Sequence, residues 1–404
     1  MLRVMRRVVL LLLGLVCVGL MRLLEPLYRV RIGCLWSNRI GHFAGNTEVY
    51  LCEVDAGMHP GGRFGGWTVW HYLNPTVCNR QLERMWKRVL RVWQFSRVVW
   101  LVNRQFAGWD RFGAEGTQLD RDVHNLYEKQ APHIGFTQQE VVEGEKGLRS
   151  MGIPEGSKWV CLIVRDSAYL GRGSEYHDYR DSSIQEYWLA AMDLTNRGYY
   201  VIRMGAKVAK PLVCANPKVI DYATNGMRSD FMDVYLLANC AFALSNGSGP
   251  DSVAVIFRRP VCYVNFAPVG YLFTMAKNTL AIWKHHERDG KRMTPAEIYA
   301  SGAHLFQRAG DYTAAGITLT ENSPQEIRDA ALEMAFKIEG IGRRRNDVPL
   351  GIWNEESFRQ KAFWKSYPRF MDPYSNKPVH GEIRMRIGRQ FLASYERAPE
   401  RLSA

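Results

Sequence analysis

A glycine-rich turn at residues 245–251 (Ser-Asn-Gly-Ser-Gly-Pro-Asp) has the composition of an anion-binding site. It lies between a predicted strand at 240–244 and a predicted helix at 251–257. Backbone N–H groups in such a turn can approach a phosphate closely, and the helix start adds about half a positive charge. We therefore expect Ser245, Asn246, Gly247, Ser248 and Gly249 to hold a diphosphate. A tight turn that binds nothing is the alternative.

Asp251, at the end of this turn, would weaken phosphate binding if it faced the phosphate. A sugar or ribose hydroxyl is one expected partner for its carboxylate. Capping of its own helix is the other.

Two arginines are placed at the ends of predicted strands. Arg165 follows the strand at 158–164, and Arg203 lies in the strand at 199–204. Ligands of open α/β sheets collect at the carboxyl ends of the strands, and guanidinium groups grip phosphate oxygens. Both arginines are predicted to bind the same diphosphate, with Gly205 and Lys207 extending the grip. The alternative is ion pairing with Asp166, Asp181 or Asp221.

His42, in Ile-Gly-His-Phe-Ala-Gly after the first strand, is the candidate general base. A neutral imidazole can take a proton from a hydroxyl near pH 7. Glu48 or Asp55 could serve instead or orient the ring, and a purely structural histidine is the other interpretation. His177 precedes a predicted helix and could touch a substrate, although Asp181 or Ser182 capping that helix is the favoured explanation of the segment.

No metal site is expected. His124 with His133, and the pair His285-His286, lack the carboxylates and spacing of a metal centre. Arginines and helix dipoles, rather than a cation, are then expected to neutralise a leaving diphosphate. Dinucleotide-binding, P-loop and nucleophile-elbow motifs are missing from the sequence, which argues against nicotinamide enzymes, P-loop ATPases and α/β-hydrolases.

Composition indicates a folded, basic, intracellular protein. The 404 residues carry 53 Lys and Arg against 40 Asp and Glu, a net charge of +13 that favours anionic partners. The basic residues are dispersed and no nucleic-acid motif accompanies them, so nucleic acid is not an expected partner. The eight cysteines form no CxxC pair, which favours free thiols in a reducing compartment.

Strand-like and helix-like segments alternate through the second half of the chain. After the strand at 158–164 come a helix (183–196), strands (199–204 and 218–222), a helix (230–239), the strand–turn–helix unit described above, and a strand at 261–265. This rhythm predicts a doubly wound parallel sheet. The first half predicts a strand at 28–36, a turn at 39–46 leading into a helix, an amphipathic helix at 80–93, and a strand or buried helix turn at 97–102.

Four regions are expected. Residues 26–150 form a first Rossmann-like lobe, 155–335 a second that binds the nucleotide, and 336–404 a helical extension; the boundary between the lobes is placed at 144–157. Residues 1–25 form an apolar membrane-associating segment. Its apolar core, residues 8–21, is shorter than the ~20 residues that span a bilayer, so a span and a cytoplasmic monotopic attachment both stay open.

Many separate runs of the sequence resemble a bacterial family of glycosyltransferases associated with surface polysaccharide genes. The similarity extends from about residue 28 to about residue 395 and includes RIGHFAGNTEVYL, HNLYEKQAPHIGFT, CLIVRDSAYL, YHDYRDSSIQEYW, YYVIRMGAKV, IDYATNGMRSDFMDVYLLA, SNGSGPDSVAVIFRRP and YVNFAPVGYLF. The resemblance implies a two-lobed GT-B architecture and transfer from a nucleotide-activated sugar. It implies no particular donor, acceptor or catalytic residue.

The sequence thus predicts a metal-independent, inverting glycosyltransferase without a cofactor, acting on a glycan or lipid-linked acceptor at the cytoplasmic face of a membrane. The sequence leaves two alternatives open. One is a sugar-nucleotide epimerase of the same fold, and the other is a non-catalytic, membrane-bound carbohydrate-binding protein.

Overall fold

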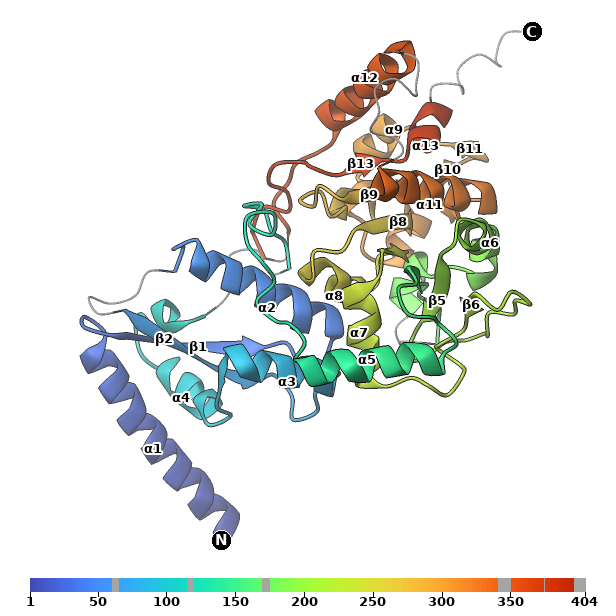
Figure 1. Ribbon diagram of the computed structural model, residues 1–404. Helices are drawn as coiled ribbons and strands as arrows, with labels where there is room; N and C mark the ends of the chain where they lie inside the picture. Colours follow the sequence, from blue (N-terminus) through green and yellow to red (C-terminus); the bar gives the residue numbers. More distant parts are fainter. Residues whose placement is uncertain (60–64, 115–119, 169–174, 341–349, 374, 396–404) are drawn as a thin grey trace.

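The computed structural model describes residues 1–59, 65–114, 120–168, 175–340, 350–373 and 375–395, which form two lobes around two parallel sheets (Figure 1). The sheet of the N-terminal lobe has the order β1 (Arg29–Leu35), β2 (Gly66–Tyr72), β3 (Arg91–Val92). The expected α/β class with two parallel-sheet lobes is confirmed. The strand predicted at 28–36 is β1.

The C-terminal lobe contains a seven-stranded parallel sheet. Its spatial order is β13 (Arg386–Ile387), β9 (Thr279–Trp283), β8 (Val261–Phe266), β7 (Phe242–Ser245), β4 (Trp159–Ile163), β5 (Tyr200–Met204), β6 (Val219–Ile220). The chain runs outward in one direction from β4 to β6 and in the other from β7 to β9, so β4 and β7 flank a topological switch point. Such a point is where open α/β sheets bind ligands.

Helices cover both sheets (Figure 1). Those before β4 are α1 (Leu2–Leu24), α2 (Ile40–Asp55), α3 (Arg80–Val89), α4 (Ser96–Asn103) and α5 (Gln138–Ser150). Those after β4 are α6 (Trp188–Asn196), α7 (Asp230–Asn239), α8 (Asp251–Ile256), α9 (Pro295–Ala300), α10 (Ala309–Ala314), α11 (Pro324–Glu339), α12 (Leu350–Ser366) and α13 (Arg389–Ser394). A small antiparallel sheet, β10 (His285–Arg288), β11 (Lys291–Arg292) and β12 (Thr318–Thr320), joins the second lobe. Short 3-10 turns include η2 (Glu175–Arg180) and η3 (Ile184–Tyr187), the latter opening the helix predicted at 183–196.

The turn predicted at 39–46 is wrong, because α2 already begins at Ile40. Its glycines allow close packing instead of turning the chain. A Cβ added at Gly41 would lie 3.0 Å from the Gly249 Cα, and one at Gly45 would lie 3.0 Å from the Asp120 Cβ. Residues 97–102, predicted as a strand or a buried helix turn, belong to α4.

The first residues of the lobe boundary predicted at 144–157 are helical, since α5 continues to Ser150. A capping box between Thr137 and Glu140 starts this helix. A Cβ at Gly144 would clash with the Tyr235 ring, so that glycine lets α5 lie against α7. The glycine-rich composition of this segment suggested a linker, but Gly144 instead allows two helices to pack closely.

The C-terminal extension is not only helical, because β13 pairs in parallel with β9 at the sheet edge. Trp283 of β9 stacks on Phe363 of α12 and meets Phe391 of α13 edge-on. The extension thus closes one edge of the second sheet, as predicted for a segment packed back onto the lobes.

Candidate functional site

A cavity of about 280 Å³ lies between the two lobes. The N-terminal lobe contributes the start of α2 and the residues Asp120 and Arg121. The C-terminal lobe contributes the turn after β7, the end of η2, and the segment after β8. Because β4 and β7 flank the switch point, the cavity occupies the position at which this topology binds ligands.

The start of α2 gives this cavity a positive end. The helix runs for 16 residues, its first turn has no acidic residue, and the Arg39 side chain at its N-cap makes no capping hydrogen bond to the described residues. The first N–H groups of a helix have no partner within it, and they carry about half a positive charge. Gly41, which lines the cavity, brings this helix end against the turn at Gly249.

Four arginines line the same cavity: Arg39, Arg121, Arg165 and Arg180. Arg180 donates to the Gly247 carbonyl, and burial lowers the pKa of its guanidinium, with the Arg165 charge adding to the effect. Burial and then the charges of Arg180, Arg165 and Arg39 lower the pKa of His177 to about 4. A neutral His177 beside several fixed cations indicates a field that favours an anionic ligand.

Arg165 forms the ion pair that was the alternative interpretation, and it also lies at the cavity. Its Nε lies 3.0 Å from the Asp181 Oδ1, as the ion-pair alternative required, yet its side chain also lines the cavity. Arg121 has its two Nη groups on the carbonyls of Tyr271 (2.7 Å) and Leu272 (2.9 Å). These contacts hold both guanidinium groups in place before any ligand arrives.

Some residues of the turn at 245–251 line the cavity, and others hold the turn in its shape. Gly247, Ser248, Gly249 and Asp251 line the cavity. Ser245 is fully buried, and its hydroxyl donates to the Asp251 Oδ2 at 2.8 Å while accepting from the Gly247 N–H at 3.1 Å. The prediction that Ser245 binds the donor is therefore corrected, because its hydroxyl is committed to the turn.

Asn246 is likewise a positioning residue instead of a ligand-binding one. Its Oδ1 accepts from the Arg165 N–H at 3.0 Å, and its Nδ2 donates to the Arg165 and Arg180 carbonyls at 3.3 and 3.1 Å. It is 2% exposed. Through these bonds it ties the turn after β7 to the two segments that carry the arginines.

Asp251 holds the turn that precedes its helix, and the alternative that it caps this helix is wrong, because the N-cap of α8 has no side-chain hydrogen bond. Its Oδ2 accepts from the Ser248 N–H at 2.9 Å as well as from Ser245, and burial raises its pKa to about 7. The folded state therefore holds a proton that the unfolded chain releases near pH 4. The free energy of unfolding should fall as pH rises from about 4 through about 7.

We expect Asp251→Asn to remove much of this pH dependence, because an amide keeps an acceptor for the Ser248 N–H and cannot ionise. Urea unfolding of both proteins at pH 5 and pH 8 measures the difference. If the free energy of unfolding changed between pH 5 and pH 8 by the same amount in both proteins, Asp251 would not titrate in this range.

Arg203 does not reach the site, and its prediction as a diphosphate ligand is wrong. The side chain is 0% exposed; Nη1 donates to the Lys210 carbonyl at 2.6 Å and pairs with Asp221 at 3.3 Å. It sits inside β5, where alternate side chains point to opposite faces of the sheet, so its place near the strand end did not make it a cleft residue.

Gly205 and Lys207 line a second cavity, of about 150 Å³. It adjoins the first, since Ile40, Arg165 and Ser248 border both. Its walls are largely apolar, from Ile163, Val164, Met204 and Leu237, with Asp166, Arg228 and Asp233 among its polar groups. Together the two cavities offer a charged compartment and a less polar one on either side of the turn.

His42 lies in the first turn of α2 and lines the larger cavity. Its Nδ1 is 3.2 Å from the Asn46 Oδ1, and its ring is 5.2 Å from that of Trp36. If Nδ1 donates to Asn46, Nε2 is left to accept a proton. The placement at the cleft follows the prediction, although the residue is helical.

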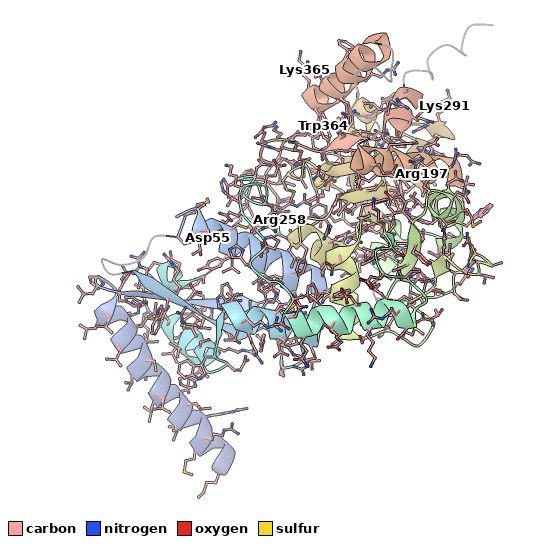
Figure 2. The ribbon with its side chains drawn as sticks, in the orientation of Figure 1. Asp55, Arg197, Arg258, Lys291, Trp364 and Lys365 are labelled. Atoms are coloured by element: carbon pink, nitrogen blue, oxygen red, sulfur yellow. The ribbon has the colours of Figure 1, made fainter. Side chains whose placement is uncertain are left out.

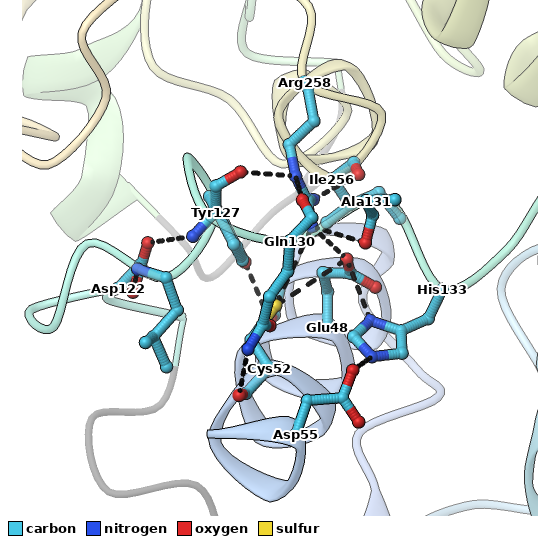
Figure 3. A network of polar contacts seen from close by, with 12 residues as sticks. Glu48, Cys52, Asp55, Asp122, Tyr127, Gln130, Ala131, His133, Ile256 and Arg258 are labelled. Carbon is cyan, nitrogen blue, oxygen red and sulfur yellow. Dashed lines mark hydrogen bonds and ion pairs between the residues drawn. The ribbon is translucent and has the colours of Figure 1, made fainter.

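Glu48 and Asp55 lie elsewhere and are corrected as alternative bases. Figure 3 shows both in a polar network along the second half of α2. Glu48 is fully buried, with Oε1 2.7 Å from the Arg258 Nη2, and Asp55 lies 3.0 Å from the His133 Nε2. Neither lines the larger cavity.

The network in Figure 3 also contains three residues whose ligand atoms lie close enough together to hold a metal ion: Glu48, Cys52 and His133. The Arg258 guanidinium already occupies it, 2.7 Å from Glu48 and 3.7 Å from the Cys52 Sγ. Burial raises the pKa of the Cys52 thiol to about 12, so the thiolate that a metal prefers is disfavoured. Arg258 lies where the lobes meet (Figure 2), and the network acts as a bridge between them.

The sequence contains one Asp-x-Asp pattern, Asp120-Arg121-Asp122, which the expectation of a metal-free site did not take into account. Asp120 lines the larger cavity. Asp122 is 2% exposed, and its two oxygens accept from the Leu126 and Tyr127 N–H groups at 2.8 Å each. The two carboxylates therefore do not converge on one cavity, and only Asp120 joins the site.

Four residues that line the larger cavity were not predicted from the sequence: Arg39, Asp120, Arg121 and Arg180. The Asp-x-Asp pattern could have drawn attention to Asp120 and Arg121, and Arg180 lies three residues after His177, just before the predicted helix at 183–196. The other histidines do not join the site. His285 pairs with Glu326 at 2.9 Å, and His286 is buried with its Nδ1 2.9 Å from the Lys284 carbonyl.

Solved glycosyltransferases are among the structures that this fold resembles. A family 9 glycosyltransferase from Veillonella parvula matches with a TM-score of 0.46 and 9% identity, over 77% of this chain and 99% of that one. The E. coli ADP-heptose heptosyltransferase II matches with a TM-score of 0.38 and 13% identity, over 76% and 99%. The E. coli heptosyltransferase WaaC, solved with ADP-2-deoxy-2-fluoro heptose, matches with a TM-score of 0.29 and 12% identity, over 67% and 98%. No family model and no curated protein matches the sequence.

Proposed function

We propose that this protein is a glycosyltransferase that binds a nucleotide-activated sugar between its two lobes. The observation that carries the proposal is the convergence of Arg165, Arg180 and the start of α2 on the turn at 247–249. A pyrophosphate is the ligand whose charge matches this set of donors. The paired cavities on either side of the turn fit a ligand with two dissimilar ends.

In this proposal the diphosphate lies at the junction of the cavities, against Ser248 and Arg165, which border both. The nucleoside occupies the smaller cavity beside Gly205 and Lys207, whose apolar walls suit a base. The sugar and the acceptor hydroxyl meet in the larger cavity, which both lobes line. The arginines and the α2 dipole stabilise the charge that develops on the leaving diphosphate, with no metal step.

The proposed reaction is a single displacement that inverts the anomeric centre. The acceptor oxygen forms a bond to the anomeric carbon, and the bond from that carbon to the diphosphate oxygen breaks with its electron pair. His42 takes the acceptor's proton on Nε2. Asp120 is the second candidate base, because it lines the same cavity from the same lobe.

Substitution of the two candidate bases separates them. We expect His42→Gln to lower the transfer rate by roughly 10²–10⁴-fold while nucleoside diphosphate affinity stays near that of wild type. Asp120→Asn should have the smaller effect on transfer. A full loss in Asp120→Asn with normal transfer by His42→Gln would reassign the base to Asp120.

The acceptor is proposed to be a glycan or a lipid-linked sugar at the cytoplasmic face of a membrane. The resemblance to enzymes of surface polysaccharide genes supports a glycan. The net charge of +13 and the apolar helix α1 support a site of action beside an anionic membrane.

The test is incubation of the full-length protein with a panel of nucleotide sugars, with and without a membrane-lipid extract as acceptor source. Release of nucleoside diphosphate that depends on the extract supports the proposal. Isomerisation of a donor sugar without the extract would instead indicate an epimerase. Binding of a glycan with no turnover of any donor would indicate a non-catalytic carbohydrate-binding protein.

A further inference from the structure

The apolar helix α1 is fixed to the N-terminal lobe along its second half. A Cβ added at Gly14 would lie 3.1 and 3.3 Å from methyl groups of Val102 and Val98 on α4. Val18 and Met21 are buried in a cluster that they share with β1 and α4. From Gly14 onward the helix is therefore part of the lobe.

A polar clamp reinforces this docking. Arg22 donates from Nε and Nη2 to the Asn103 Oδ1 at 3.0 and 2.9 Å, and from Nη1 to the Ala107 carbonyl at 3.0 Å. Just past the helix, Glu25 forms an ion pair with Arg111, with Oε2 3.0 Å from Nη2. These contacts fix the direction in which α1 leaves the lobe, seen in Figure 1 as a helix extending away from the rest of the protein.

The outward faces of α1 are strongly apolar. Within the described residues it is the one helix long and apolar enough to cross a membrane by length and composition, and only 17% of its apolar window is buried. Its large side chains that are about half exposed or more are Val4, Met5, Val8, Val9, Leu11, Leu12, Leu13, Leu15, Val16, Leu20, Leu23 and Leu24. Figure 2 shows the N-terminal half of α1 extending away from the protein body.

Exposed apolar groups continue from α1 onto α4 and the loop after it. Leu101 is 50% exposed, Phe106 41% and Trp109 36%. Phe106 lies under the Arg22 guanidinium, and Trp109 packs edge-on against Trp100 of α4. We call the exposed residues of α1, with Leu101, Phe106 and Trp109, the α1–α4 platform.

Basic residues accompany this platform. Arg6 and Arg7 are exposed near the start of α1, Arg97 is exposed on α4, and the exposed Arg104 stacks over the Trp109 ring at 5.2 Å. Aromatic side chains and arginines at the edge of an apolar surface are typical of a membrane interface. Their charge selects an anionic lipid surface over a neutral one.

The docked geometry also argues against a transmembrane span. Between Arg7 and the contact at Gly14 lie six residues, Val8 to Leu13. At 1.5 Å per residue this apolar stretch reaches about 9 Å, against roughly 30 Å of hydrocarbon. A perpendicular insertion to that depth would leave Arg6 and Arg7 in the hydrocarbon, whereas a helix lying flat lets them reach the headgroups.

We propose that the α1–α4 platform lies flat in one leaflet of an anionic phospholipid bilayer, so that the protein is monotopic and its N-terminus stays on the same side as its lobes. This inference does not depend on the proposed transferase activity, because it rests on other residues and is tested by binding alone.

Flotation of the full-length protein with phosphatidylcholine vesicles, with or without phosphatidylglycerol, tests the surface. We expect the double variant Leu101→Glu/Trp109→Glu to bind anionic vesicles roughly tenfold more weakly or worse, since each change removes an apolar group from the lipid. Val213→Glu, at an 80% exposed position of the other lobe, is the matched control and should bind like wild type.

Arg97→Gln/Arg104→Gln is a second variant that leaves the apolar surface intact. It should lose affinity for anionic vesicles roughly tenfold and keep its weaker binding to phosphatidylcholine. Melting temperatures verify that the variants fold. If both double variants bound anionic vesicles as tightly as wild type, α4 would have no role in membrane binding.

Protease protection of an N-terminal epitope tag tests the topology. When full-length protein is bound to the outside of sealed vesicles, the proposal predicts that added protease removes the tag with or without detergent. Protection of the tag until detergent is added would show that α1 crosses the bilayer, and it would overturn the monotopic arrangement.

Discussion

Replacing Arg180 with alanine is expected to weaken nucleoside diphosphate binding by roughly 10–100-fold, because a charge-assisted hydrogen bond to phosphate is worth about 1.5–3 kcal/mol. The effect on transfer should be larger, roughly 10²–10³-fold in kcat/KM, since charge on the diphosphate grows in the transition state. Calorimetric titration and donor-turnover kinetics measure the two quantities.

Two companion variants separate this role from a structural one. Arg180→Lys keeps the charge and should recover part of the affinity, although it loses the planar fork. Arg288→Ala, at an exposed site on β10, should change neither quantity. Because Arg180 also donates to the Gly247 carbonyl, the melting temperature of each variant is measured too. Normal turnover in a folded Arg180→Ala protein would remove this residue from the site.

The second large effect is expected at the bridge between the lobes. Arg258→Ala should lower the free energy of unfolding by about 3–5 kcal/mol, because it removes the arginine from the buried Glu48 carboxylate and leaves that carboxylate with His133, 3.2 Å away. The guanidinium also donates to the carbonyls of Tyr127 at 3.0 Å and Ala131 at 3.1 Å, so the loss frees groups both on α2 and on the segment 127–131.

Urea unfolding of wild type, Arg258→Ala and Arg258→Ala/Glu48→Gln measures this effect. The double variant should regain part of the stability, since an uncharged amide costs less to bury. His133 supplies a pH signature. Burial disfavours the protonated ring of His133, but Glu48 and Asp55 outweigh burial and raise the pKa of this histidine. The contribution of His133 to the free energy of unfolding is therefore present at low pH and is lost as pH rises through that pKa. A loss below about 1 kcal/mol in Arg258→Ala would contradict the bridge.

The parallel sheet of the second lobe could be predicted because its strands are buried, short and separated by helical segments. The turn at 247–249 was also predictable, since a tight turn after a strand favours glycine where φ is positive, as it is at Gly247. Strands β9 and β13 were not foreseen. β13 is two residues long, and it exists because β9 leaves a free sheet edge, a tertiary cause with no local pattern.

Errors in the candidate site have one physical origin. Position along a strand says which sheet edge a residue is near, but the direction of the side chain decides whether it meets a ligand. Arg203 is buried with Asp221, whereas Arg180, outside any regular strand, reaches the cavity. Glycine was misinterpreted for a related reason: Gly41 and Gly144 permit close helix packing, which composition alone does not distinguish from a turn.

The central claim is that a nucleotide diphosphate binds where the two lobes meet. Amide hydrogen exchange on wild-type protein, with and without the tightest-binding nucleoside diphosphate, tests it most directly. The account predicts slower exchange in both lobes, at 40–46 and at 245–252, with Arg180→Ala losing both effects at the same ligand concentration. Protection confined to one lobe, or protection elsewhere with these two segments unchanged, would contradict it.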